Sequence, residues 1–190
     1  MKKKVFATGL AAFVMWLPFG ASAADYVIDT KGAHASINFK VSHLGYSFIK
    51  GRFNDFGGDF SYDPKNVSAS KISVTVDTTS LDSNHAERDK HIRSGDFINA
   101  SKFSKATFKS TSVVDKGDGK LEVNGDLNLH GVTKPITIDA QFIGAGPDPW
   151  GGERAGFDGK VRLELADFKI PVVGSSSYVD MELHVEGIKK

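Results

Sequence analysis

Residues 176–187 read SSYVDMELHVEG, a stretch that alternates apolar and polar side chains almost without a break. The apolar residues occupy every second position, at Val179, Met181, Leu183 and Val185. Side chains two apart along a β-strand lie on the same face of a sheet. The stretch therefore predicts a strand with one apolar and one hydrated face, and it points to a β fold for the rest of the chain.

The same alternation recurs earlier in the chain. Seven further runs show it, at residues 36–43, 48–62, 71–79, 105–114, 120–130, 135–144 and 156–167. Eight such strands in sequence predict an all-β fold, a closed eight-stranded antiparallel β-barrel. Gly57 and Gly58 in the second run predict a bulge or a sharp bend, and Pro135 is expected to begin its strand because it cannot donate a ladder hydrogen bond.

One segment departs from the β pattern. Asn84 followed by Glu87 resembles a capping box, which predicts a short helix from His85 to Arg93 that stops at Gly95. This helix would form a crossover between strands 3 and 4 of the barrel. Three apolar residues just beyond it could plug that end of the barrel: Phe97, Ile98 and Phe103.

The first 23 residues have the features of a secretory signal peptide. They carry three lysines at the start, an apolar run, and small residues at Ala21, Ser22 and Ala23. Cleavage is expected after Ala23, which leaves residues 24–190 as one exported, periplasmic domain. The whole chain has a formal net charge of +1, and losing the three lysines makes the remainder slightly acidic, so nucleic acid is not an expected partner. The chain has no cysteine, which excludes disulfides and thiolate metal sites.

The sequence offers no catalytic constellation. GxSxG, HExxH and phosphate-binding glycine motifs are absent, and an SxxK match at residues 68–71 lacks its companion motifs. A metal-like set does occur, formed by His85, Glu87, Asp89 and His91. Its pairs four residues apart lie on different sides of a helix, so capping and local ion pairs explain it better. No catalytic residue, metal or cofactor is predicted.

Strand parity separates the two faces of the barrel. The outward face takes residues such as Lys40, Thr75, Asn128, Asp139, Arg162 and Glu182. The inward face takes Ile37, Phe39, Val41, Phe53, Phe60, Val74, Val76, Leu127, Leu129, Ile136, Ile138, Phe142, Leu163, Met181 and Leu183. An eight-stranded barrel lies near the boundary between a filled interior and one that holds a small ligand. The alternation alone therefore does not decide between a packed core and a cavity.

A loop rich in proline and glycine, DPWGGERAGF at residues 148–157, places Trp150 and Arg154 at a barrel rim. Arg154 could hold the polar head of a ligand through its rigid donor fork. Alternatively, Trp150 packs over the barrel end and Arg154 pairs with a nearby acid.

Four segments together resemble one known family. They are HLGYSFIKGRFNDFGGDF (residues 43–60), NHAERDKHIRSGDF (84–97), GDLNLHGVTKPITI (125–138) and DPWGGERAGF (148–157). On these segments the chain is similar to the YceI-like family of bacterial exported polyisoprenoid-binding proteins, over essentially all of residues 24–190. The resemblance is weakest near residues 171–177.

The resemblance implies an extended, lipocalin-like barrel whose lumen holds an isoprenoid lipid, such as a polyprenyl quinone or related amphiphile, without enzymatic activity. The inward residues would then line the ligand, and Arg88, His91, Trp150 and Arg154 are the candidates for a head-group or rim role. Transient membrane contact and a homodimer are both compatible with this function. Two alternatives stay open: an outer-membrane β-barrel with its apolar face outward, and a structural periplasmic barrel without a ligand.

Overall fold

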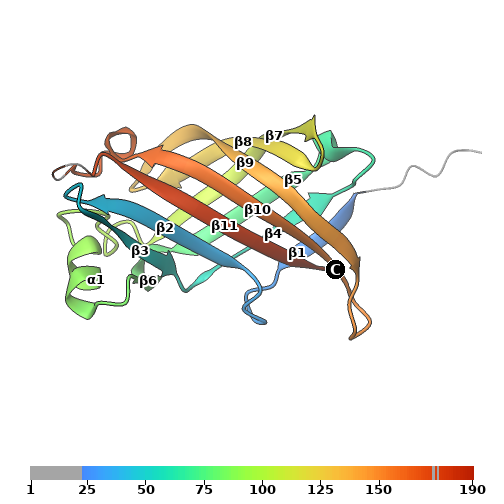
Figure 1. The fold of residues 1–190 in the computed structure, drawn as a ribbon, viewed down its shortest axis with the longest axis horizontal. Coiled ribbons are helices and arrows are strands. Elements are labelled where there is room, and N and C mark those ends of the chain that lie inside the picture. Colours follow the sequence, from blue (N-terminus) through green and yellow to red (C-terminus); the bar gives the residue numbers. More distant parts are fainter. Residues whose placement is uncertain (1–22, 173, 175) are drawn as a thin grey trace, which may run out of the picture.

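The computed structural model describes residues 23–172, 174 and 176–190 (Figure 1). The expected signal segment, apart from Ala23, lies outside the described residues. Among the described residues, no helix is both long and apolar enough to cross a membrane.

Antiparallel strands build the molecule. In the described part of the chain, one eleven-stranded sheet contains β1 (Ala24–Ile28), β2 (Ser36–His43), β3 (Ser47–Phe53), β4 (Phe56–Tyr62), β5 (Lys71–Asp77), β6 (Leu81–Asp82), β7 (Lys105–Gly117), β8 (Lys120–Leu129), β9 (Val132–Pro147), β10 (Glu153–Glu164) and β11 (Tyr178–Lys189). The helical pieces are α1 (Ala86–Ile92) and three short 3-10 turns, η1 (Val67–Ala69), η2 (Thr78–Ser80) and η3 (Leu165–Phe168).

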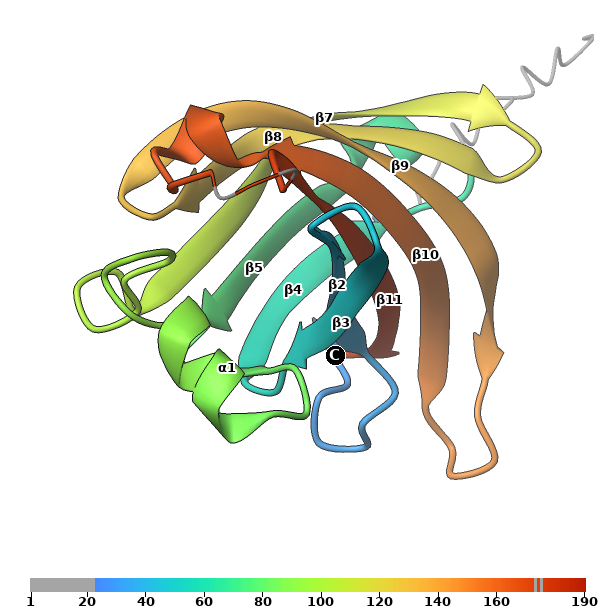
Figure 2. The same cartoon turned by 60° about the vertical axis from the view of Figure 1, so that its left-hand side comes forward.

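Eight of these strands close into a barrel. The ring runs β1-β4-β5-β7-β8-β9-β10-β11, and pairing of β1 with β11 completes it. The fold therefore confirms the prediction of a closed eight-stranded antiparallel barrel with one short helix. Strand β11 also pairs along its first half with β2, which carries β3 and β6 as a branch of the wall. Figure 2 shows this branch and α1 beside one open end of the barrel.

The membership of the ring differs from the sequence prediction. Strand β1 was not expected, yet its residues pair with β4 on one side and β11 on the other. The predicted strand at residues 48–62 is two strands, β3 and β4, that belong to different parts of the wall. The chain breaks at Asn54 and Asp55, whose backbone amides donate to the carbonyl and hydroxyl oxygens of Ser80. Because that anchor lies beside β6, the break redirects the chain from the branch into the ring.

Two local predictions were wrong. Gly57 and Gly58 form no bulge, because β4 keeps a regular register with β5 from Phe56 to Ser61. Glycine at 58 is required by close approach, since a Cβ there would lie 2.2 Å from the carbonyl oxygen of Ser73. Pro135 lies inside β9 instead of starting it. Its missing N–H is tolerated because β10 pairs with β9 only from Asp139 onward.

Helix α1 lies in the crossover from β6 to β7, as predicted, but its cap is different. The Nδ1 atom of His85 accepts from the backbone amide of Arg88 at 3.2 Å. Asn84 instead adopts a left-handed conformation with φ of 63°, and its amide donates to Asp82. The capping box between Asn84 and Glu87 is therefore wrong, because the cap falls one residue later.

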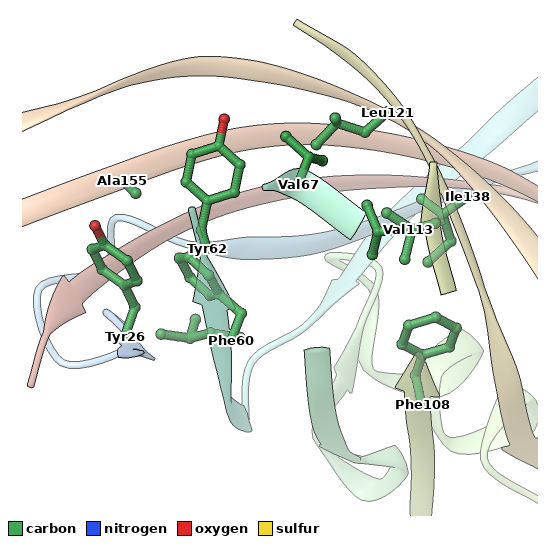
Figure 3. Close-up of a cluster of buried hydrophobic side chains, with 11 residues drawn as sticks. Tyr26, Phe60, Tyr62, Val67, Phe108, Val113, Leu121, Ile138 and Ala155 are labelled. Atoms are coloured by element: carbon green, nitrogen blue, oxygen red, sulfur yellow. The ribbon is translucent and has the colours of Figure 1, made fainter. Parts of the chain in front are cut away.

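A tight aromatic cluster fills the barrel end away from α1. Five rings from four strands meet with centroids 4.9–5.5 Å apart in stacked, tilted and edge-on pairs: Tyr26, Phe60, Tyr62, Phe142 and Phe157. Figure 3 shows Tyr26, Phe60 and Tyr62 beside Ala155, which is 1 % exposed. A second cluster of Leu163, Phe168 and Ile170 lies around η3. The aromatic residues also belong to a larger buried cluster that includes Phe108, Val123 and Ile138.

Candidate ligand-binding site

The barrel encloses a cavity of about 570 Å³. Apolar side chains from the ring and from the β2–β3 branch form most of its wall, and α1 contributes at one end. This volume lies within the roughly 300–1,000 Å³ that is usual for small-molecule sites. The interior is therefore a cavity and not a fully packed core, which parity alone could not decide.

All but one of the residues assigned to the interior by parity lie on the cavity wall. They are Ile37, Phe39, Val41, Phe53, Phe60, Val74, Val76, Leu127, Leu129, Ile136, Ile138, Leu163, Met181 and Leu183. Phe142 is the exception. It stacks on Tyr62 at 5.2 Å and contacts Phe157, so it belongs to the aromatic cluster that closes the end.

Polar groups on the cavity wall are few and unevenly placed. Three ionisable residues, His43, Arg88 and His91, lie at the α1 end. Asp158 also contributes to the wall, but its carboxylate lies 2.6 Å from Nδ1 of the half-exposed His184. The hydroxyl of buried Ser70 faces the cavity from the start of β5 and has no hydrogen-bond partner among the described residues. The rest of the wall is mainly hydrocarbon, so a ligand meets the basic side chains at the α1 end.

Arg88 and His91, the two candidate head-group residues of α1, differ in how firmly their side chains are held. The guanidinium of Arg88 donates from Nε to the Ser83 hydroxyl at 2.7 Å and from Nη2 to the Ser83 carbonyl at 2.5 Å. Buried Asp89 accepts a hydrogen bond from the backbone amide of the same serine at 2.9 Å. His91 is exposed, and its ring lies edge-on to Phe97. Arg88 therefore anchors α1, whereas Nε2 of His91 lies 3.4 Å from the exposed carboxylate of Asp96.

Several wall residues at the α1 end were not among those that the sequence pattern assigned to the interior. Leu44, Ile92, Phe97, Ile98 and Pro171 surround the α1 end of the cavity. Only Phe97 and Ile98 had been considered, as a plug for that end, and both now lie on its wall. Phe103 instead packs edge-on to His130.

Trp150 and Arg154 lie at the opposite end and outside the cavity wall. Trp150 is 77 % exposed, so it does not pack over the barrel end. Arg154 donates to Asp29 at 2.7 Å, to Asp148 at 2.9 Å and to Glu186. Its Nε and Nη1 atoms donate to these three carboxylates, which matches the ion-pair interpretation.

Asp29 is the buried centre of this network. Besides Arg154, it accepts from His34 Nδ1 at 2.9 Å and from the Gly32 amide at 2.8 Å. Asp29, His34 and Glu186 have the composition of a metal site, but Arg154 already forms ion pairs with both carboxylates. The hydrogen bond from Arg154, followed by those from His34 and Gly32, lowers the pKa of Asp29 to about 2. The network ties the β1–β2 loop to β10 and β11.

Acid is therefore expected to weaken this end of the barrel. The pKa of Asp29 is lower in the folded protein than in the unfolded chain, so its contribution is present above about pH 5 and is lost as the pH falls towards 2. The shift corresponds to about 2 kcal/mol of stability. Urea unfolding at neutral and acidic pH should show a smaller acid sensitivity for Asp29→Asn than for the wild type. Equal pH slopes for the two proteins would contradict this assignment.

These features define the class of protein. An antiparallel barrel with an apolar lumen and basic side chains at one mouth is a lipocalin-like barrel. The chain belongs to the YceI-like domain family, whose family model matches residues 26–187.

Individual relatives agree with this assignment. The chain is 80% identical over 190 residues to a UPF0312 protein of Vibrio parahaemolyticus, with all of both chains covered. Among solved structures, BcnA of Burkholderia cenocepacia superposes with a TM-score of 0.75 at 18% identity, covering 84% of this chain and 98% of BcnA. A polyisoprenoid binding domain from Saccharophagus degradans, implicated in plant cell wall breakdown, superposes at 0.62 with 15% identity, covering 89% and 100% of the two chains. At these identities the two structures support the fold alone.

Proposed function

We propose that this protein is an exported carrier that holds an isoprenoid lipid, such as a polyprenyl quinone or related amphiphile, in its barrel lumen. The observation that carries the proposal is the cavity of about 570 Å³ walled by hydrocarbon. A polar ligand would lose its hydration there without gaining hydrogen bonds, which is costly. A hydrocarbon tail gains roughly 0.8 kcal/mol for each methylene taken out of water. The S. degradans structure is described as a polyisoprenoid binding domain, and this description supports the same ligand class for this chain.

The distribution of basic and apolar residues on the cavity wall also suggests an orientation for the ligand. Apolar residues surround the middle of the lumen, and the aromatic cluster closes the far end. The basic side chains on the wall, His43, Arg88 and His91, stand at the α1 end. The tail would therefore enter first, and the polar head would remain beside α1.

The periplasm is the proposed compartment, and its support is the signal-like composition of residues 1–23. Such a carrier would perform no chemistry on its ligand. Neither alternative fits the structure as well. A membrane-spanning barrel needs an apolar outer face, whereas Thr75, Asp139 and Lys160 lie exposed on the outside of the ring. A ligand-free structural barrel gives no reason for an open apolar lumen.

A single preparation of the protein tests both the proposed compartment and the proposed ligand. Protein released by osmotic shock and purified without detergent is expected to begin at Ala24 and to carry an isoprenoid amphiphile. Native mass spectrometry followed by lipid extraction measures both. The delipidated protein should bind a long polyprenyl compound in preference to a short polar analogue. A clean protein without lipid, whose affinity is indifferent to tail length, would overturn the carrier proposal.

A further inference from the structure

Large apolar side chains are exposed in a cluster at the mouth of the cavity. The turn between β2 and β3 presents Leu44, Tyr46 and Phe48, which are 54 %, 89 % and 58 % exposed. Val172 is 46 % exposed in the segment after η3. That segment lies against the turn, because a Cβ on Gly174 would be 3.2 Å from Cδ2 of Leu44. These four apolar side chains are called the mouth tip below.

The mouth tip is continuous with the lumen. Leu44 belongs to both, and its neighbours His43 and Ile49 also line the cavity. Pro171, next to Val172, lines it from the other side. Figure 2 shows the β2–β3 hairpin, α1 and the segment after β10 around this one end. An apolar tail could therefore pass from the tip into the lumen without crossing water.

The charged residues of the β2–β3 hairpin, which carries most of the mouth tip, are all basic. From Thr30 to Asn54 the sequence contains no aspartate or glutamate, while it contains Lys31, Lys40, Lys50 and Arg52. Lys40 and Lys50 are directly opposite each other across β2 and β3. Like charges in that relation cost stability, and an anionic surface would relieve the cost.

Carboxylates from neighbouring elements face part of this charge, since Asp82 of β6 lies directly opposite Arg52. Asp180 of β11 is 3.9 Å from Lys40, but it is committed to Arg162 at 2.7 Å. The ammonium of Lys40 also lies 5.1 Å from the centre of the Phe48 ring, so a cation stands beside an exposed aromatic side chain. This pairing of aromatic ring and amine is suited to the headgroup region of a bilayer.

We propose that the mouth tip docks the barrel onto an anionic phospholipid bilayer, with the cavity mouth facing the membrane. The role of this contact in loading and release rests on the carrier function proposed above. Four side chains are few for a stable protein interface, which covers roughly 800 Å² on each partner. They are enough for a reversible contact with a bilayer, where apolar insertion and attraction by Lys50 act together.

Vesicle co-sedimentation tests the docking. Delipidated protein should bind vesicles of phosphatidylethanolamine with phosphatidylglycerol more strongly than vesicles of phosphatidylcholine, and added salt should weaken the binding. The double variant Tyr46→Ser, Phe48→Ser should bind about tenfold less, because two exposed side chains no longer insert. Lys50→Glu should reduce binding to the anionic vesicles only. The matched control Ile143→Ser removes an apolar side chain that is 64 % exposed elsewhere on the barrel, and its binding should be unchanged.

A second measurement separates docking from ligand binding. Neither Tyr46 nor Phe48 lines the cavity, so the double variant should bind a short prenyl alcohol in solution as the wild type does. Wild-type protein that binds the alcohol but no vesicles would overturn docking and leave the carrier function standing. Protein that binds vesicles but not the alcohol would overturn the carrier function. If the wild type is a dimer that the double variant dissociates, the tip covers a second copy of the chain and the membrane proposal is wrong.

Discussion

Val74→Asp is expected to lower the free energy of unfolding by about 3 kcal/mol or more and to abolish retention of an apolar ligand. Val74 lies on the cavity wall in the middle of β5, opposite Phe108 of β7 and Gly58 of β4. No basic side chain lines the wall outside the α1 end, so an introduced carboxylate has no partner. Burial would raise its pKa, and the loss of stability should therefore be greater at neutral pH than near pH 4. Urea unfolding at the two pH values measures this difference.

The neighbouring residue supplies the control. Thr75 is exposed on the other face of the same strand, and Thr75→Asp should change the stability by less than about 0.5 kcal/mol. Its ligand binding should equal that of the wild type. If the two variants behaved alike, or if the effect of Val74→Asp did not depend on pH, the assignment of Val74 to a dry lumen would be wrong.

The side-chain pattern predicts the faces of the strands well because facing is a local property. In β11, Val179, Met181, Leu183 and Val185 all reach the cavity wall, as the alternation of the sequence indicates. The same rule places Val74 and Ile138 correctly on strands with quite different composition. Parity depends only on each residue's own strand, so it survives errors in the boundaries of that strand.

Strand pairing is not local, and there the prediction failed. Nothing within residues 48–62 shows that β3 pairs with β2 while β4 joins β1 and β5. The break depends on Ser80, which lies 25 residues away from Asp55. Arg154 gives a similar case, because its partner Asp29 is 125 residues away in sequence. A sequence shows that an arginine needs an acid, but only the fold shows which acid it meets.

Whether an inward residue lines a cavity or fills a core also depends on the fold. Phe142 and Ile138 have the same parity on β9, yet Phe142 belongs to the aromatic cluster and Ile138 faces the cavity. The difference comes from their neighbours. Ile138 pairs with Val123, whereas Phe142 meets the rings of Tyr62 and Phe157. Alternation alone cannot report how much volume the facing side chains fill.

A larger side chain in the lumen is expected to keep or raise the stability of the protein while it weakens the binding of long ligands. Ala140 lines the cavity on β9, and its cross-strand neighbour on β10 is Gly159, which has no side chain. Because Ala140 lines the cavity, Ala140→Phe should extend its ring into the lumen and keep or raise the stability, as cavity filling often does. Long prenyl tails should lose about tenfold in affinity if two methylenes no longer fit, since each contributes roughly 0.8 kcal/mol. Affinity should also level off at a shorter tail than in the wild type.

Ala155→Phe is the matched substitution in a packed region. Ala155 is 1 % exposed, lies in the buried cluster with Tyr26 and Phe60, and does not line the cavity. Overpacking there should lower the free energy of unfolding by about 1–3 kcal/mol. Thermal unfolding and a series of prenyl alcohols of increasing length, applied to both variants, measure the contrast. If Ala140→Phe destabilised the protein as much as Ala155→Phe and left the tail-length profile unchanged, the barrel interior would be a core, and the lumen could not hold a lipid.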